Sequence, residues 1–80
     1  MIPPRIENVK TLNNFLLEIT YVTKEKKLYD MKKILKLDYY KNLKNIGYFM
    51  LAKSTGPTIE WPNGEDIDPN DLYNNSIYID

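Results

Sequence analysis

Residues 58–73 read TIEWPNGEDIDPNDLY, and this stretch carries the most distinctive local signals of the chain. Ile59 and Trp61 alternate with polar neighbours, which predicts a strand over residues 58–61. Pro62 is expected to end that strand, because proline lacks the amide that a sheet ladder needs. The pair Asn63-Gly64 is the strongest short turn signal in the sequence, so the chain is expected to reverse here.

The second half of the same stretch predicts the start of a helix. Asp68 can accept the free amides of a first helical turn, and Pro69 suits the first helical position. Asp71 then places a negative charge near the positive end of the helix dipole. A short helix is therefore expected to begin here, followed by an extended tail over residues 77–79.

Three strands are predicted in the first part of the chain. Residues 6–12 carry apolar side chains at a spacing of three, so this strand is expected to contain a bulge. Asn13-Asn14 predicts a two-residue hairpin, because Asn tolerates positive φ. Residues 15–22 form the clearest strand, and residues 27–29 form a short third one. One face of the clearest strand is expected to carry Phe15, Leu17, Ile19 and Tyr21.

Two short helices and a further strand are predicted in the middle of the chain. Asp30 and Asp38 are the expected N-caps of the two helices, since each carboxylate can accept free amides. Gly47 is expected to end the second helix with positive φ. Residues 48–53 alternate in side-chain character and predict a fourth strand, and residues 54–57 predict a hairpin loop that leads to residues 58–61.

These elements define an α+β fold in a single compact domain over residues 1–80. The predicted order is β-β-β-α-α-β-β-α, with an approximately five-stranded, mostly antiparallel sheet and short helices on one face. A chain of 80 residues is expected to form one domain. No apolar run approaches the ~20 residues of a membrane helix and no signal peptide is evident, so a cytoplasmic location without membrane contact is expected.

The composition removes most familiar chemistries. The sequence contains no Cys, which excludes a disulfide framework, a thiolate metal site and a Cys nucleophile. It also contains no His, the side chain that titrates nearest neutral pH and the commonest transition-metal ligand. No catalytic residue, cofactor or metal is therefore predicted.

Charge is balanced overall but divided along the chain. Residues 24–44 carry eight lysines against three carboxylates, a net charge of +5, and residues 60–80 carry six carboxylates and no basic residue. Two opposed charged surfaces of this kind favour a protein partner, or a second copy docked head-to-tail or with two-fold symmetry. This segregation is the main electrostatic prediction from the sequence.

The stretch that begins at the Trp also carries a family signature: a Trp-Pro-Asn-Gly turn, an Asp-Ile pair, a Pro, and a Leu-Tyr pair. This pattern resembles the bacterial domain-of-unknown-function 2442 family, and the resemblance extends to Pro4, Ile6 and Tyr29-Asp30. Residues 23–26 depart from it, because that turn usually contains Gly. The signature residues are Trp61, Pro62, Asn63, Gly64, Asp66, Pro69, Leu72 and Tyr73.

The resemblance implies a compact α+β domain and no established catalytic activity. Some relatives are fused to helix-turn-helix domains, and stand-alone genes often neighbour another small protein. These associations suggest a role in toxin–antitoxin-like pairs, which is an argument from analogy. The signature itself is expected to be structural.

The acidic residues of the signature region suggest two kinds of site, a calcium loop and a catalytic acid–base pair. Residues 66–70 match the start of a calcium loop, but position six is Asp71 instead of Gly and position twelve is Ile77 instead of Glu. Paired acid–base chemistry is a further hypothesis, but carboxylates beside a helix start stay ionised. Turn and cap roles are therefore expected, with Asp66 holding the turn through backbone amides. The acid–base hypothesis concerns Glu65, Asp66, Asp68 and Asp71.

Two further features each have two interpretations. Trp61 is either a core residue, which its alternation with Ile59 favours, or an exposed interaction anchor. The lysines of residues 24–44, with Tyr29, Tyr39 and Tyr40 among them, are either the solvated face of a helix or a nucleic-acid surface. The absence of Arg from this segment disfavours base recognition through paired hydrogen bonds.

Three functional hypotheses follow. The first is a non-enzymatic protein–protein interaction or accessory module. The second is a nucleic-acid-associated regulatory component of a toxin–antitoxin-like pair. The third is an enzyme that uses only carboxylates, and it would require a pocket lined by several titratable side chains.

Overall fold

A computed structural model describes residues 2–79 of the chain. These residues form a four-stranded antiparallel sheet in the order β1-β2-β3-β6 and a separate two-stranded antiparallel sheet. The first sheet contains β1 (Ile6–Leu12), β2 (Leu16–Tyr21), β3 (Lys26–Asp30) and β6 (Ile77–Tyr78). The second sheet contains β4 (Lys53–Ser54) and β5 (Ile59–Glu60).

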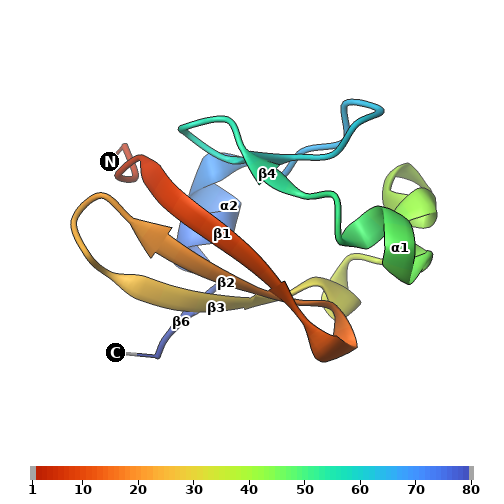
Figure 1. The fold of residues 1–80 in the computed structure, drawn as a ribbon, viewed down its shortest axis with the longest axis horizontal. Helices are drawn as coiled ribbons and strands as arrows, with labels where there is room; N and C mark the ends of the chain where they lie inside the picture. The colour runs from red at the N-terminus through yellow and green to blue at the C-terminus, as the bar shows by residue number, and fades with distance from the viewer. Residues whose placement is uncertain (1, 80) are drawn as a thin grey trace.

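Within residues 2–79, five short helices connect or cover these strands. Two are α-helical, α1 (Ile46–Phe49) and α2 (Pro69–Asn74). The 3-10 helices are η1 (Asn13–Phe15), η2 (Met31–Lys33) and η3 (Asp38–Lys44). Figure 1 shows α2 behind the four-stranded sheet, and α1 at the end of the molecule away from the two chain termini.

A single core lies on one face of the four-stranded sheet. Leu17, Ile19 and Tyr21 alternate along β2 and are at most 1% exposed, whereas the residues between them are only half-buried. This period-two pattern confirms the predicted strand and its buried face. Helices and the second sheet close the core from the other side with Met31, Leu35, Leu43, Phe49, Ile59, Trp61, Ile67 and Leu72.

The first hairpin confirms the expected bulge and corrects the expected turn. The register shifts between Ile6 and Asn8, which is the bulge in β1. Three residues, not two, join β1 to β2, and φ is 64° at Asn14 and 60° at Phe15. Phe15 therefore does not belong to β2. Its ring packs edge-on against Phe49 with centroids 5.2 Å apart, and this burial offsets the strained backbone.

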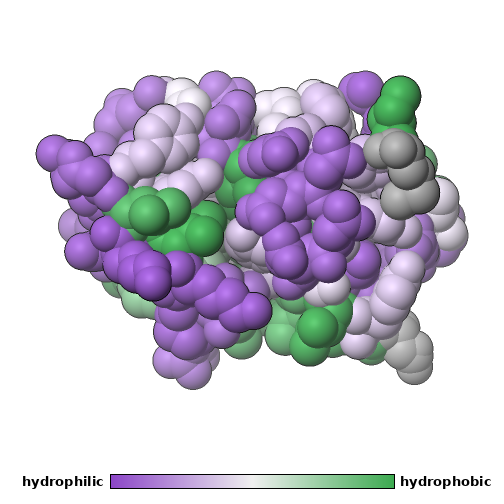
Figure 2. All heavy atoms as spheres, turned by 180° about the vertical axis from the view of Figure 1, so that it is seen from behind, coloured by the Kyte–Doolittle hydropathy of each residue, from purple (hydrophilic) through white to green (hydrophobic). Residues whose placement is uncertain are grey.

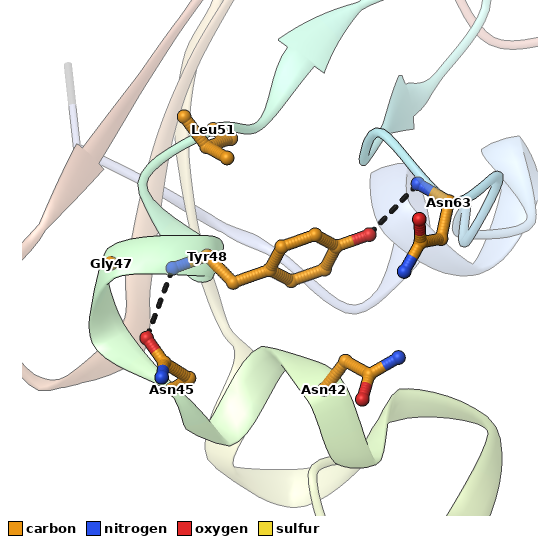
Figure 3. Close-up of a pocket in the computed structure, with 6 residues that line it drawn as sticks. All are labelled: Asn42, Asn45, Gly47, Tyr48, Leu51 and Asn63. Atoms are coloured by element: carbon orange, nitrogen blue, oxygen red, sulfur yellow. Dashed lines mark hydrogen bonds between the residues drawn. The ribbon is translucent and has the colours of Figure 1, made fainter.

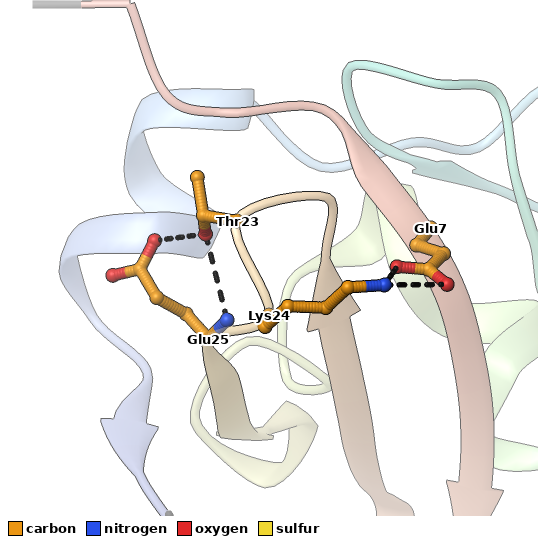
Figure 4. Close-up of polar contacts among 4 residues, drawn as sticks. All are labelled: Glu7, Thr23, Lys24 and Glu25. Carbon is orange, nitrogen blue, oxygen red and sulfur yellow. Dashed lines mark hydrogen bonds and ion pairs between the residues drawn. The ribbon is translucent and has the colours of Figure 1, made fainter.

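The turn between β2 and β3 lacks the usual glycine, and a lysine takes its place. Lys24 has φ 76°, and its ammonium group lies 3.1 Å from the Glu7 carboxylate on β1 (Figure 4). Thr23 donates its hydroxyl to Glu25 over 2.6 Å in the same turn. Side-chain contacts thus hold a left-handed conformation that glycine would adopt without strain.

Two of the three predicted caps are confirmed. The Asp30 carboxylate accepts from the Lys32 amide at 2.9 Å, although the element it begins is a single 3-10 turn. The Asp68 carboxylate accepts from the Asn70 amide at 3.2 Å, and Pro69 occupies the first turn of α2. Asp38 is not an N-cap, because it lies inside the first turn of η3.

The strand predicted over residues 48–53 is wrong, because its first half is helical. The Asn45 side chain accepts from the Tyr48 amide at 3.2 Å and starts α1 there. Gly47 lies inside this helix and does not adopt the expected positive φ. Of the apolar residues in the run, Phe49 is buried, while Met50 and Leu51 are 62% and 54% exposed. A short apolar run fits either structure, and the cap and the core decide between them.

The single five-stranded sheet is also wrong, and the reason lies in long-range pairing. The tail forms β6 and pairs with β3, with Lys27 opposite Tyr78 and Leu28 opposite Ile77. The other two strands stay apart as the β4–β5 hairpin, which meets the edge of β1 where the Ile6 amide donates to the Gly56 carbonyl at 2.7 Å. Strand partners of this kind are set by the core and are not encoded locally.

A buried lysine holds β6 in place. Lys27 is 4% exposed, and its ammonium group donates to the Tyr73 carbonyl at 2.6 Å. It lies 3.9 Å from the Tyr73 ring centroid and 4.5 Å from that of Tyr78. Both tyrosine hydroxyls donate to Glu25 at 2.7 Å. Burial lowers the pKa of Lys27, and the Glu25 carboxylate opposes that shift.

Candidate functional site

Half of the large apolar side chains that are exposed in residues 2–79 lie in the segment that contains η3 and α1. We call residues 37–51 the apolar segment, because five large apolar side chains there are 48–62% exposed. They are Leu37, Tyr39, Ile46, Met50 and Leu51. Figure 2, which shows the side of the molecule that carries α2, has several small apolar clusters among polar atoms. Exposed apolar groups rimmed by polar residues are typical of interaction surfaces.

An open groove of about 440 Å³ lies between this segment and the signature turn. Its lining comes from η3, from α1 with the turn after it, and from the signature turn (Figure 3). None of the lining side chains carries a charge at neutral pH. The lining residues are Asn42, Asn45, Gly47, Tyr48, Leu51 and Asn63.

Tyr48 forms the centre of the groove and is held by two hydrogen bonds. Its hydroxyl donates to the Glu65 carboxylate at 2.6 Å. It also accepts from the Asn63 amide at 2.8 Å (Figure 3). Burial raises the pKa of Tyr48, and the hydrogen bond to Glu65 raises it further. The ring therefore has a fixed position between α1 and the signature turn.

Glu65 lies behind the groove as a buried carboxylate. It is 6% exposed, and the Asn42 side chain donates to its second oxygen at 3.3 Å. Burial alone would raise the pKa of Glu65, but hydrogen bonds from Tyr48, from its own backbone amide and from Asn42 outweigh it and lower the pKa. The negative charge is thus satisfied from within the fold.

The Trp of the signature is a core residue, as its alternation with Ile59 predicts. Trp61 is 1% exposed, its indole nitrogen donates to the Phe49 carbonyl at 2.9 Å, and its ring stacks on Phe49 at 6.3 Å between centroids. It is therefore not an exposed interaction anchor. The rest of the signature turn is closed by the Gly64 amide, which donates to the Trp61 carbonyl at 2.8 Å. Pro62 occupies the second position of this turn, where its fixed φ fits.

Asp66 plays a different part from the one expected. Its carboxylate accepts from the Tyr39 hydroxyl at 3.4 Å, and its carbonyl accepts from the Tyr40 hydroxyl at 2.9 Å. These donors are side chains of η3, not backbone amides of the turn. Asp66 therefore links the signature turn to the apolar segment. Among the later signature residues, Leu72 is fully buried and Tyr73 packs on the Lys27 ammonium group.

Each of the four carboxylates considered for acid–base chemistry is engaged by a different partner. Glu65 and Asp66 bind the tyrosines named above, Asp68 caps α2, and Asp71 accepts from the Tyr29 hydroxyl at 3.2 Å. None of them lines the groove. Within residues 2–79, no three acidic side chains are arranged to hold a metal ion. No helix in this part of the chain has the length and apolar character to cross a membrane.

Within residues 2–79, the two charged segments of the sequence meet through hydrogen bonds from neutral donors to carboxylates instead of ion pairs. Tyrosines and an asparagine of the basic segment donate to carboxylates of the acidic one. Across residues 2–79, the ion pairs are Lys24 with Glu7 and Lys32 with Asp30. Lysines that are exposed and outside these pairs include Lys33, Lys36, Lys41 and Lys44.

The sequence does not predict the groove, because the alternating side chains of residues 48–53 predict a strand there. A strand would place Tyr48 and Leu51 on opposite faces, whereas the helical turn brings both to the groove. The available signal was Asn45, which stands three residues before Tyr48 and is a good N-cap residue. That signal competes with the alternation of apolar residues that follows it.

Fold and site together define a class of protein: a small α+β domain in which a signature turn supports a neutral, open groove. The chain belongs to the family described as "Protein of unknown function (DUF2442)", which matches residues 6–78. This confirms the family that the signature residues suggested. No curated protein and no solved structure matches the chain.

Proposed function

We propose that this protein is a non-enzymatic, cytoplasmic protein-interaction module whose contact surface is the apolar segment, residues 37–51. The observation that carries the proposal is the concentration of exposed apolar side chains there. Exposure of Ile46, Met50 and Leu51 at 49%, 62% and 54% leaves apolar area that a partner would remove from water. Tyrosine, methionine and other large side chains are also typical of interface cores.

The groove is better suited to binding a partner than to catalysing a reaction. Tyr48 is the sole titratable side chain in its lining, and the Tyr48 hydroxyl is already engaged by Glu65 and Asn63. The lining asparagines provide amide groups that can form hydrogen bonds, and Leu51 provides apolar surface. These are the components of a recognition surface.

The test compares two substitutions that place a carboxylate on exposed apolar positions. Met50→Asp lies in the apolar segment, whereas Ile77→Asp lies on β6 and is the matched control, since Met50 and Ile77 are 62% and 63% exposed. Self-association is measured by light scattering, and partner capture is measured with the tagged full chain. We expect Met50→Asp to lose the association and Ile77→Asp to keep it. Equal retention by both variants would contradict the proposal.

Nucleic-acid binding in a toxin–antitoxin-like pair is the second candidate function. It is favoured by four exposed lysines that have no carboxylate partner in residues 2–79, namely Lys33, Lys36, Lys41 and Lys44. Binding through phosphates would weaken steeply with salt. A mobility-shift assay with DNA and RNA at low salt tests this candidate, and the absence of any shift would eliminate it.

A further inference from the structure

The groove beside Tyr48 presents unused amide groups next to apolar side chains. The side-chain oxygen of Asn45 accepts from the Tyr48 amide, and the side-chain nitrogen of Asn42 donates to Glu65. The other half of each carboxamide is therefore available. Within the described residues, the Asn63 side chain makes no hydrogen bond. Carboxamides pair with both the N–H and the C=O groups of a peptide backbone.

Two lysines stand next to lining residues of the groove in the chain. Lys41 and Lys44 are three residues apart on η3, so they lie on the same side of this 3-10 helix, next to Asn42 and Asn45 in the chain. Both lysines are exposed and have no carboxylate partner in residues 2–79. The nearest carboxylate behind the lining, Glu65, is buried and satisfied by its own donors. The free charges at this edge therefore favour an acidic ligand.

The groove is open, and the Tyr48 and Asn45 side chains in its lining are already held in place. An enclosed pocket would surround most of a small ligand, whereas an open groove admits a chain that continues at both ends. Tyr48 is held by Glu65 and Asn63, and Asn45 is held by its capping bond. Little ordering is then needed when a ligand binds, which favours affinity.

From these observations we infer that the groove binds an extended acidic peptide segment of a partner protein. Its backbone would pair with the carboxamides of Asn42, Asn45 and Asn63. Its apolar side chains would rest on Tyr48 and Leu51, and its carboxylates would face Lys41 and Lys44. This inference rests on the proposed interaction function and specifies the chemistry of the partner.

The experiment titrates the uniformly ¹⁵N-labelled full chain with an end-capped synthetic peptide in which Glu alternates with Leu and Ala. A counterpart with Gln at every Glu position is the neutral control. We expect the side-chain amide signals of the three asparagines and the backbone signal of Tyr48 to shift with the acidic peptide. Binding of the neutral peptide is expected to be about tenfold weaker, and salt should weaken the acidic complex.

Two double lysine variants test which positive charges contribute to binding of the acidic peptide. Replacing Lys41 and Lys44 with Gln is expected to lower affinity for the acidic peptide about tenfold. Replacing Lys33 and Lys36 with Gln removes the same charge from the segment before η3 and should change affinity far less. Dispersed spectra check that each variant is folded. Unshifted asparagine signals, equal binding of the neutral peptide, or equal losses in the two lysine variants would overturn the inference.

The outcomes separate this inference from the proposed function. If Met50→Asp abolishes partner capture but the acidic peptide leaves the asparagine signals unchanged, the apolar segment is the contact surface and the peptide inference fails. If the peptide binds the groove but Met50→Asp retains every partner, the peptide inference stands and the larger contact surface fails.

Discussion

The indole nitrogen of Trp61 donates to the main-chain carbonyl of Phe49 over 2.9 Å, and the two rings stack with centroids 6.3 Å apart. This contact joins the signature turn to the last residue of α1. The helix that presents Tyr48 to the groove is thereby fixed to the core. Trp61, which its alternation with Ile59 predicted to be a core residue, therefore also positions a neighbouring element.

Substitution Trp61→Phe tests this coupling. It removes the indole donor and leaves a cavity in a site that is 1% exposed. We expect the free energy of unfolding to fall by about 2–3 kcal/mol, as measured by urea denaturation. Leu51→Ala is the control at a 54% exposed position and should change it by less than about 0.5 kcal/mol. Equal effects of the two substitutions would show that Trp61 is not a core support.

A buried hydroxyl without a partner makes Tyr21→Phe a stabilising candidate. Tyr21 is 1% exposed, and within residues 2–79 its hydroxyl makes no hydrogen bond. Burial raises the pKa of Tyr21 to about 12, with smaller contributions from Glu25 and Tyr78. Tyr21→Phe keeps the edge-to-face contact with Tyr73 and removes an unsatisfied group, so stability should be unchanged or rise by up to about 1 kcal/mol.

Tyr29→Phe is the matched control for that prediction. The Tyr29 hydroxyl donates to Asp71 at 3.2 Å, so its removal should cost about 1 kcal/mol in thermal or urea unfolding. A loss of stability in Tyr21→Phe equal to that in Tyr29→Phe would mean that the Tyr21 hydroxyl does have a partner in solution.

Stability should depend on pH through Glu25. Hydrogen bonds from Thr23, and then from Tyr73 and Tyr78, lower the pKa of Glu25 from 4.5 to about 2. Because the folded-state pKa is the lower one, the stabilisation is fully present above about pH 4.5 and is lost as the pH falls toward 2. We expect the gap in urea midpoint between wild type and Glu25→Gln to close over that interval. A gap that does not change with pH would contradict the assignment.

Tyr48→Phe should raise the pKa of Glu65. The substitution removes the donor 2.6 Å from the carboxylate, whereas the burial that disfavours the charged form stays. Carboxyl NMR titration of both proteins measures the change. Asn45→Ala is a control, because it removes the α1 cap without removing a direct donor to Glu65. An unchanged Glu65 pKa in Tyr48→Phe would show that the hydrogen bond is absent in solution.

Glycine substitutions distinguish a turn from a helix. Gly64 has φ +95° with open space around its α-carbon, so Gly64→Ala tests backbone strain alone and should cost about 1 kcal/mol. Gly47 lies within α1, where an added methyl group would meet only the Asn45 side chain at 3.2 Å. Gly47→Ala should cost clearly less in urea denaturation. The opposite order would support the positive φ first expected at Gly47.

The sequence predicted an element correctly where the structure depends on interactions between residues that are close together in the chain. Asp30 and Asp68 were found as caps because a short carboxylate can reach amides two residues away. The alternation along β2 identified its buried face for a similar reason, since a strand exposes every second side chain to the same environment. The groove depends on contacts between η3, α1 and the signature turn, and it had no comparable local signal.

The sequence by itself determined the family, the α+β class, the caps at Asp30 and Asp68, and the burial of Trp61 beside Ile59. The tertiary structure alone decided that the tail pairs with β3 around Lys27, that the β4–β5 hairpin stays separate, and that residues 48 and 49 are helical instead of extended. The physical reason is the range of the interactions. Caps and turns are closed by neighbours in the chain, whereas sheet partners and the conformation of a short apolar run depend on which distant side chains fill the same core.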